Sequence, residues 1–363
     1  MDVEQEQRIE GSGFHIPSLN GLRTVAFMLV FVGHAGLDKL VPAGFGVTIF
    51  FFLSGYLITT LLRREVDRRK HLSFKRFYLR RVLRILPPFY LVLLGGLALT
   101  AAGLLTVPGG LDWGGVTAQF LHLTNYFQII HPNRHVTPGS EVYWSLAVEE
   151  HFYLLFPLLY VGMRKGKLIG RDQARVILAI CAAVLVWRCV LVFGLDSSVF
   201  RTYYATDTRI DSILFGCALG VYGNPMLDPM WLTERVWKRW LLPASLALLF
   251  FCLVYRNPDF RETFRYSLQG IGLYAIFYCA VRYPQWALMR WLNVRWVAFV
   301  GTLTYSLYLV HATVLLTLEE QFPGLPEAVR GAIGLGMSLL LAYAIYRLVE
   351  RPIGRLRRRL EPA

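Results

Sequence analysis

Two histidines, adjacent glutamates and several arginines stand in or beside long apolar stretches of this sequence, where ionisable side chains are costly and mark functional candidates. Arg23 and His34 are eleven positions apart, which places them within about 20° of one helical face and about 16 Å apart along the axis. We predict that both face one polar interior. The alternatives are that Arg23 snorkels from a helix start and that His34 is a structural histidine bonded to another helix.

A second group opens a later apolar stretch. Ser145 and Glu149 are four residues apart and therefore face the same way on a helix, with Glu150 and His151 directly after them. A histidine with a carboxylate nearby is the minimal apparatus for taking a proton from a hydroxyl group. Because this group falls at about the predicted depth of His34, we predict that the two share an interior; the alternative is an interfacial charge cluster in water.

Basic residues repeat at helical spacing before the third apolar stretch. Arg76, Arg80 and Arg84 share one face, and Lys75 and Arg81 flank it. Guanidinium groups match phosphate oxygens in two-pronged geometry, so this face predicts a site for a phosphorylated ligand. The alternative is a basic amphipathic segment that lies on anionic lipid.

Two further groups are less specific. Asp207 and Asp211 flank Arg209 and form either a salt-bridged helix start or a polar site for a hydroxylated acceptor. Tyr305 and His311 lie in a late apolar stretch, where a second intramembrane histidine is either part of a site or hydrogen-bonded for structure.

The apolar stretches predict membrane helices. The chain is 55% hydrophobic and 17% charged, whereas soluble domains carry about 25% charged residues. Stretches of about 20 apolar residues match a bilayer core about 30 Å thick, where helices satisfy their own backbone. The stretch 116–130 is apolar enough for an eleventh span or a re-entrant segment, but it contains His122 and Asn125 and is assigned to an outer loop. Gly216 and Gly220 predict a close helix contact. We predict an all-α bundle of about ten transmembrane helices, at 22–38, 43–62, 85–106, 142–162, 174–194, 209–224, 239–255, 267–283, 296–317 and 329–349.

Basic residues predict the orientation. Ten lysines and arginines lie between Arg63 and Arg84, and others recur in alternate loops and near the C-terminus. With both termini cytoplasmic, this asymmetry accounts for the formal charge of +14 without nucleic acid as a partner. The five cysteines form no CxxC pair and predict neither a metal site nor disulfides. We expect a polar tail 1–15, a membrane domain 16–352 and a basic tail 353–363.

In order and spacing, these motifs resemble acyltransferase family 3, integral membrane proteins that include bacterial O-acetylases of envelope polysaccharides. Arg23, followed after ten residues by His34, is similar to the family's Arg-x10-His motif. Segment 81–84 is similar to its Arg-x-x-Arg motif, and segment 145–149 to its Ser-x-x-x-Glu motif. The resemblance covers about residues 16–352. No esterase-like SGNH domain is expected, so the chain looks like the stand-alone form, which either hands on acyl groups or acylates the final acceptor itself.

The resemblance implies acyl-CoA, most often acetyl-CoA, as a co-substrate, with no permanently bound cofactor and no metal. It implies a sugar or glycan hydroxyl as the acceptor and a multi-pass location in the bacterial inner membrane. The CoA phosphates are expected to meet Arg80, Arg81 and Arg84, with Arg23 further along the path.

On the same interpretation His34 is the general base for the acceptor hydroxyl, and Glu149 orients it within a catalytic group that includes Ser145. An acyl-histidine intermediate is the alternative. The residues assigned to acceptor binding are Asp207, Arg209, Asp211, Tyr305 and His311. The competing class is a proton-coupled transporter or flippase, which also places ionisable residues in membrane helices. Dependence on CoA separates the two classes.

Overall fold

The residues that the structure describes, 16–37, 41–107 and 109–359, form helices and connections without a β-strand. This computed structural model therefore confirms the all-α fold that the sequence predicts. The predicted polar tail 1–15 lies outside the described residues, as does the end of the predicted basic tail, 360–363.

Long helices at the ten predicted positions make up most of the described chain. They are α2 (Pro17–Val32), α3 (Ala43–Arg69), α4 (Phe74–Ala101), α7 (Trp144–Lys165), α8 (Arg171–Cys189), α10 (Thr206–Val221), α12 (Leu242–Val254), α14 (Phe264–Arg282), α16 (Arg295–Gln321) and α17 (Glu327–Ile345). Eight of them, some extended by an adjoining turn, are long and apolar enough to cross a membrane. The exceptions are α10, which has 16 residues, and α14, whose first turns are polar. The chain is a multi-pass membrane protein, and the count of ten crossings stays a prediction.

The segment assigned to an outer loop forms two short helices, α5 (Trp113–Phe120) and α6 (Thr124–Ile130). His122 joins them with a φ of +55°. Helix α6 packs against α7 and against the short helix α9 (Val199–Tyr204). His122 thus marks the break between the two helices, and Asn125 lies buried inside α6.

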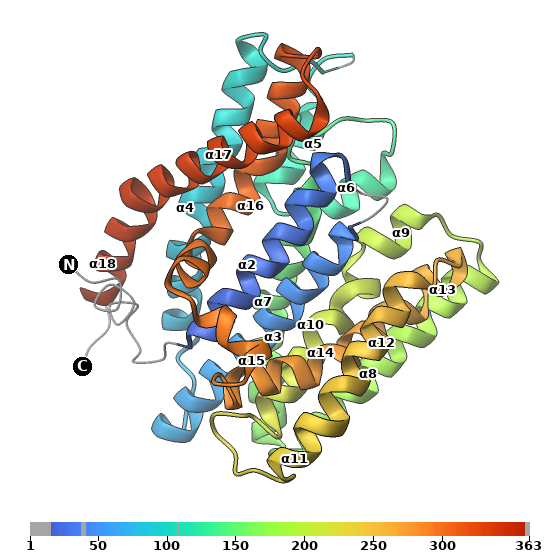
Figure 1. Cartoon of the computed structure of the whole chain (residues 1–363), viewed down its shortest axis with the longest axis vertical. Helices are drawn as coiled ribbons and strands as arrows, with labels where there is room; N and C mark the ends of the chain where they lie inside the picture. Colours follow the sequence, from blue (N-terminus) through green and yellow to red (C-terminus); the bar gives the residue numbers. More distant parts are fainter. Residues whose placement is uncertain (1–15, 38–40, 108, 360–363) are drawn as a thin grey trace.

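Helix α10 lies at the centre of the bundle, and nearly all of its residues are buried. It packs most extensively against α3 and α8, while α2 packs against α3 and α16. Figure 1 shows α8, α12 and α14 on one side of this centre and α4, α16 and α17 on the other. Helix α10 is therefore enclosed by helices on both sides.

Glycines determine the closest helix contacts. A Cβ atom at Gly216 would lie 2.0 Å from the carbonyl oxygen of Phe52, and one at Gly55 would lie 1.9 Å from that of Ile213. Helices α3 and α10 therefore touch backbone to backbone, which confirms the close contact predicted at Gly216. Helices α16 and α2 are equally close, because a Cβ atom at Gly301 on α16 would lie 2.0 Å from the carbonyl oxygen of Asn20 on α2.

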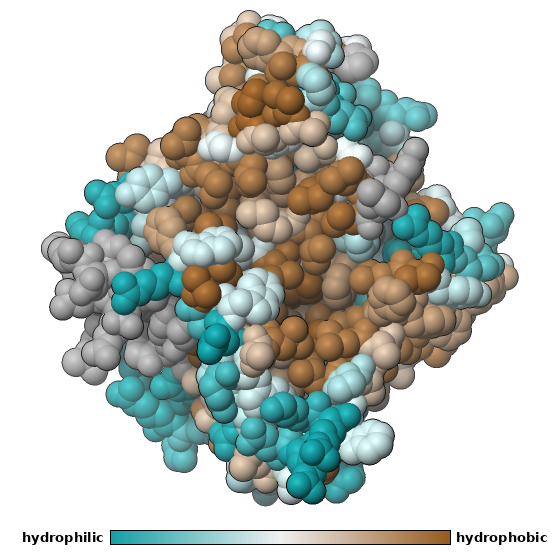
Figure 2. Space-filling view, viewed as in Figure 1, coloured by the Kyte–Doolittle hydropathy of each residue, from teal (hydrophilic) through white to brown (hydrophobic). Residues whose placement is uncertain are grey.

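The outer surface is apolar where lipid is expected. Large side chains such as Phe250 on α12 and Leu340 on α17 are 68% and 72% exposed. Figure 2 shows hydrophobic residues gathered across the middle of one face, with hydrophilic residues toward its edges. An exposed apolar surface of this extent is stable in a bilayer and costly in water.

Candidate active site

A cavity of about 1120 Å³ opens into the bundle between α2, α3, α4, α7 and α16, with a contribution from α18 (Arg351–Arg359). Its described lining holds eleven arginines against five carboxylates. The arginines are Arg23, Arg63, Arg64, Arg68, Arg69, Arg76, Arg80, Arg81, Arg84, Arg351 and Arg355, and the carboxylates are Glu65, Asp67, Glu149, Glu150 and Glu350. This excess of positive charge, held between low-dielectric walls, favours an anionic occupant.

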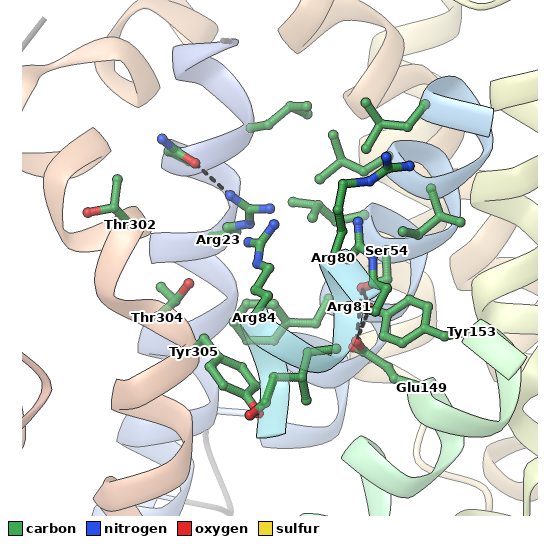
Figure 3. A pocket seen from close by; sticks show the side chains of 18 of the residues that line it. Arg23, Ser54, Arg80, Arg81, Arg84, Glu149, Tyr153, Thr302, Thr304 and Tyr305 are labelled. Atoms are coloured by element: carbon green, nitrogen blue, oxygen red, sulfur yellow. Dashed lines mark hydrogen bonds between the residues drawn. The ribbon is translucent and has the colours of Figure 1, made fainter. Parts of the chain in front are cut away.

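All four arginines assigned to a phosphorylated donor line this cavity, namely Arg23, Arg80, Arg81 and Arg84. Arg23 donates a hydrogen bond to the Asn20 side chain at 2.7 Å. Figure 3 shows Arg23 on α2 and Arg84 on α4 facing each other from opposite walls. Arg81 lies 5.2 Å from the ring centroid of Tyr153 on α7. Helices α2 and α4 thus direct these guanidinium groups into one space.

Two ion pairs brace the open end of the cavity. Arg80 pairs with Glu65 at 2.9 Å, and Arg63 binds Asp228 through both guanidinium nitrogens at 2.9 and 2.5 Å. Burial alone acts to raise the pKa of Asp228, but hydrogen bonds from Arg63 and from the Asn224 backbone outweigh it and hold this pKa below its ordinary value. These pairs fix α3 to α4 and to the connection that follows α10.

Glu149 lies deeper in the cavity but does not contact His34. Its carboxylate accepts hydrogen bonds from Tyr153 at 2.6 Å and from Ser54 at 3.1 Å (Figure 3). The predicted role of Glu149 in orienting His34 is therefore not seen, because the carboxylate faces α3 and the arginine-lined space. The sequence interpretation missed Tyr153 as its partner, although their spacing of four residues on α7 is a signal for such a pair.

His34 is paired with the second intramembrane histidine. Its Nδ1 lies 3.1 Å from Nε2 of His311, and the two rings stack with centroids 5.2 Å apart. His34 is exposed on the π-helical turn η1 (Gly33–Leu37) at the end of α2, where Gly36 adopts a φ of +103°, whereas His311 is fully buried on α16. Neither histidine lines the cavity.

Tyr308 separates the closed end of the cavity from the histidine pair. Its hydroxyl lies 2.7 Å from the Ser145 hydroxyl and donates to the carbonyl of Val142 at 3.1 Å. The Tyr308 ring is 6.0 Å from that of Phe50 on the cavity wall and 5.4 Å from that of His311. Ser145 and Tyr308 are both buried, so they close the cavity at the side on which the histidines lie.

The three charged residues at the start of α10 do not form one acceptor site. Asp207 pairs with Arg201 of α9 at 2.5 Å, and Asp211 pairs with Arg188 of α8 at 2.7 Å. Each carboxylate is paired with an arginine from another helix, which favours the salt-bridged helix start over the acceptor site, and the assignment of the two aspartates to acceptor binding stays a prediction. The sequence interpretation missed Arg188, a lone charge inside an otherwise apolar stretch.

Arg209 is fully buried and is surrounded by aromatic rings instead of a carboxylate. Its guanidinium carbon lies 3.9 Å from the Tyr266 ring centroid and 5.2 Å from that of Tyr203, with rings of Phe51 and Trp144 further out. Such rings stabilise a desolvated cation. The geometry gives Arg209 no access to an acceptor in this state, so its assignment to acceptor binding is not supported here.

Tyr305 lies in the arginine-lined cavity, away from the exposed face of His34. Its hydroxyl donates to the carbonyl of Ile85 on α4 at 2.9 Å. Figure 3 shows it on α16 beside Arg84. The position brings Tyr305 together with the predicted donor-binding arginines.

The family of this chain follows from comparison with known proteins. A sequence profile described as an acyltransferase domain matches residues 16–347. The chain therefore belongs to this acyltransferase family, as its motifs predict. No solved structure matches the chain.

Relatives from three bacteria have similar sequences. Peptidoglycan O-acetyltransferase OatA of Listeria monocytogenes is 28% identical over 352 residues, with 93% of this chain and 56% of that protein covered. The putative peptidoglycan O-acetyltransferase YrhL of Bacillus subtilis is 30% identical over 364 residues, covering 93% and 55%. The putative O-acetyltransferase SACOL0978 of Staphylococcus aureus is 26% identical over 353 residues, covering 93% and 57%. The chain thus spans just over half the length of these relatives.

Proposed function

We propose that this chain transfers an acyl group, specifically acetyl, from acyl-CoA to a hydroxyl group of a glycan. The observation that carries the proposal is the arginine-lined cavity, whose closed end at Tyr308 lies beside the histidine pair that includes the exposed His34. Relatives described as O-acetyltransferases support the choice of the acetyl group.

The donor occupies the cavity in this proposal. CoA carries several phosphate groups, and arginines match phosphate oxygens in two-pronged geometry. Arg68, Arg76 and Arg355 are exposed at the open end, and Arg23 lies deeper. The phosphates bind among these residues, and the pantetheine arm extends toward the closed end at Tyr308.

His34 acts on the acceptor. Its imidazole accepts the proton of the acceptor hydroxyl, and the hydroxyl oxygen forms a bond to the thioester carbonyl carbon. The carbon–sulfur bond then breaks, and the CoA thiolate leaves with the proton that His34 accepted. Because Tyr308 lies between the cavity and the histidines, its side chain rotates away from Ser145 to admit the thioester.

The two ends of the site face opposite sides of the membrane. Basic residues favour the cytoplasmic side of a membrane, so the arginine-rich opening of the cavity faces the cytoplasm, where acyl-CoA is available. The exposed face of His34 then meets an acceptor on the outer side of the bacterial inner membrane. Peptidoglycan is the first acceptor to test, because relatives carry that name.

Binding of acetyl-CoA to the protein in lipid nanodiscs tests the donor site. Arg23→Ala and Arg84→Ala are each expected to weaken binding about ten- to hundredfold, the effect of one lost hydrogen bond to a charged group. Arg171→Ala, at the exposed start of α8 and outside the cavity, is the matched control and should bind normally. Absence of acetyl-CoA binding by the wild-type protein would contradict the proposal and favour a transporter.

Transfer to the acceptor is measured separately. Envelope glycans of cells with and without the gene are compared by mass spectrometry. Wild-type protein or the His34→Ala variant is then expressed in the cells that lack the gene. Loss of acetyl groups that wild type restores and His34→Ala does not is the expected result. Normal acetylation by His34→Ala would eliminate His34 as the base.

A further inference from the structure

The paired histidines have a hydrogen-bond order that can be derived from one fixed acceptor. Nδ1 of His311 lies 2.8 Å from the backbone carbonyl oxygen of Tyr308. A carbonyl oxygen only accepts, so Nδ1 of His311 carries the proton. A neutral imidazole has one N–H group, and Nε2 of His311 therefore presents a lone pair.

That lone pair faces His34. Nδ1 of His34, at 3.1 Å, must then be the donor of the hydrogen bond between the rings. The same count applied to His34 leaves its Nε2 without a proton. We infer that His311 is a positioning residue that holds His34 in the Nδ1–H tautomer, so that Nε2 of His34 is the atom that accepts the proton of the acceptor hydroxyl. The functional part of this inference rests on the proposed function.

The surroundings of His311 keep this order in place. The residue is fully buried, and its ring contacts those of Phe27 and Phe31, at centroid distances of 5.8 and 6.4 Å. Both of its ring nitrogens are engaged, one as a donor and one as an acceptor. If the protonated nitrogen of His311 faced His34, two N–H groups would oppose each other. The carbonyl of Tyr308 would then also lose its hydrogen-bond donor.

The arrangement also determines what happens to the proton. When Nε2 of His34 accepts it, the resulting imidazolium donates a stronger, charge-assisted hydrogen bond from Nδ1 to His311. The proton on the far nitrogen of His311 faces a carbonyl that cannot take it. The pair therefore cannot pass a proton beyond His311, and the accepted proton is returned to the departing thiolate from Nε2 of His34. His311 thus supplies the orientation and stabilisation that the sequence interpretation gave to Glu149.

Two substitutions at position 311 separate this role from simple packing. His311→Leu fills the space but offers no acceptor, and His311→Gln retains a side-chain oxygen that can accept from His34. We expect acetyl transfer to fall about ten- to hundredfold in His311→Leu, the effect of losing one hydrogen bond to a developing cation. His311→Gln should recover most of that loss. Acetyl-CoA binding should stay normal in both variants, since neither alters the cavity lining. Equal activity of the Leu variant and wild type would overturn the inference.

A measurement independent of activity reads the tautomer directly. Protein labelled with ¹⁵N-histidine is examined by NMR, and the His34 signals are assigned from their loss in His34→Gln. Wild type should show a protonated Nδ1 and a bare Nε2 on His34, and His311→Leu should show a mixture of tautomers. A protonated Nε2 in wild type would refute the inference even if transfer is confirmed. The expected tautomer together with normal transfer by His34→Ala would instead refute the proposed base and leave the pairing intact.

Discussion

Removal of the Asp211 carboxylate should destabilise the protein rather than weaken acceptor binding. Asp211 and Arg188 form an ion pair in which both side chains have 0% exposure. Asp211 accepts hydrogen bonds from Arg188 at 2.9 and 2.7 Å and from Ser267 at 2.8 Å. In Asp211→Ala the guanidinium keeps its bonds to two backbone carbonyls and to Ser267 but loses its counter-charge in a site without water access.

Breaking one partner of such a buried pair costs about 3–5 kcal/mol, which is roughly a hundred- to several-thousandfold in the folding equilibrium. Replacement of both partners by apolar residues leaves no uncompensated charge. The double variant Arg188→Met/Asp211→Leu should therefore be more stable than Asp211→Ala. A salt-bridged helix start predicts this order, and a substrate-binding carboxylate does not.

The assay is the fraction of protein that remains folded after heating in detergent, measured by size-exclusion chromatography. Asp172→Ala, which breaks an exposed ion pair with Arg175, is the matched control and should behave as wild type. If Asp211→Ala were as heat-resistant as wild type and had a raised KM for the acceptor, the reasoning would be refuted and a role of Asp211 in acceptor binding would be favoured.

Three further changes test other parts of the structure. Gly216→Ala should lower thermal stability by about 1–3 kcal/mol, because its Cβ would lie 2.0 Å from the Phe52 carbonyl oxygen, and unchanged heat resistance would contradict that contact. Burial, with a smaller effect of the His151 charge, lowers the pKa of His122 to about 4 from 6.5. The folded protein should therefore lose stability as pH falls from about 6.5 toward 4, since His122 takes up a proton in the unfolded chain before it does so in the folded one. His122→Phe should reduce this loss, which is measured by thermal melting at several pH values. Tyr308→Ala should raise hydrolysis of acetyl-CoA in the absence of acceptor, because it opens the layer between cavity and histidines, and a hydrolysis rate equal to wild type would argue against a barrier at Tyr308.

The sequence predicted those features that depend on one helix at a time. Helical spacing alone placed Arg23 and His34 on one face about 16 Å apart, and the cost of charge in lipid identified both histidines. Arg80, Arg81 and Arg84 were grouped correctly for the same reason, because their neighbours are on their own helix. The arginines that line the proposed donor cavity are therefore largely visible in the sequence.

Partners from different helices could not be predicted in this way. Glu149 and His34 were expected to pair because their predicted depths are similar, but depth does not specify which helix faces which. Rotation about the helix axes is decided by packing, in which glycines such as Gly55 allow backbone contact and larger residues prevent it. Arg188 illustrates the same limit, since nothing in its own apolar stretch indicates that Asp211 is its counter-ion.

Helix α2 carries both ends of the proposed site and therefore sets their separation. Arg23 and His34 are eleven residues apart, or about 16 Å along the axis, several times the length of a hydrogen bond. An acyl donor whose phosphates lie near Arg23 must be extended to bring its thioester to His34. Two of the contacts between α2 with its final turn and α16 lie near the ends of this path, where Gly301 meets the Asn20 backbone and where His311 meets His34.

These two contacts restrict how the path opens. Sliding of α2 along α16 by one turn, about 5.4 Å, would break the hydrogen bond between the histidines and drive the Asn20 carbonyl against side chains larger than Gly301. Rotation of the Tyr308 side chain leaves both contacts intact and breaks its hydrogen bonds to Ser145 and Val142 and its ring packing against Phe50 and His311. The lower cost of that change favours a side-chain gate over a moving helix as the step that admits the thioester to His34.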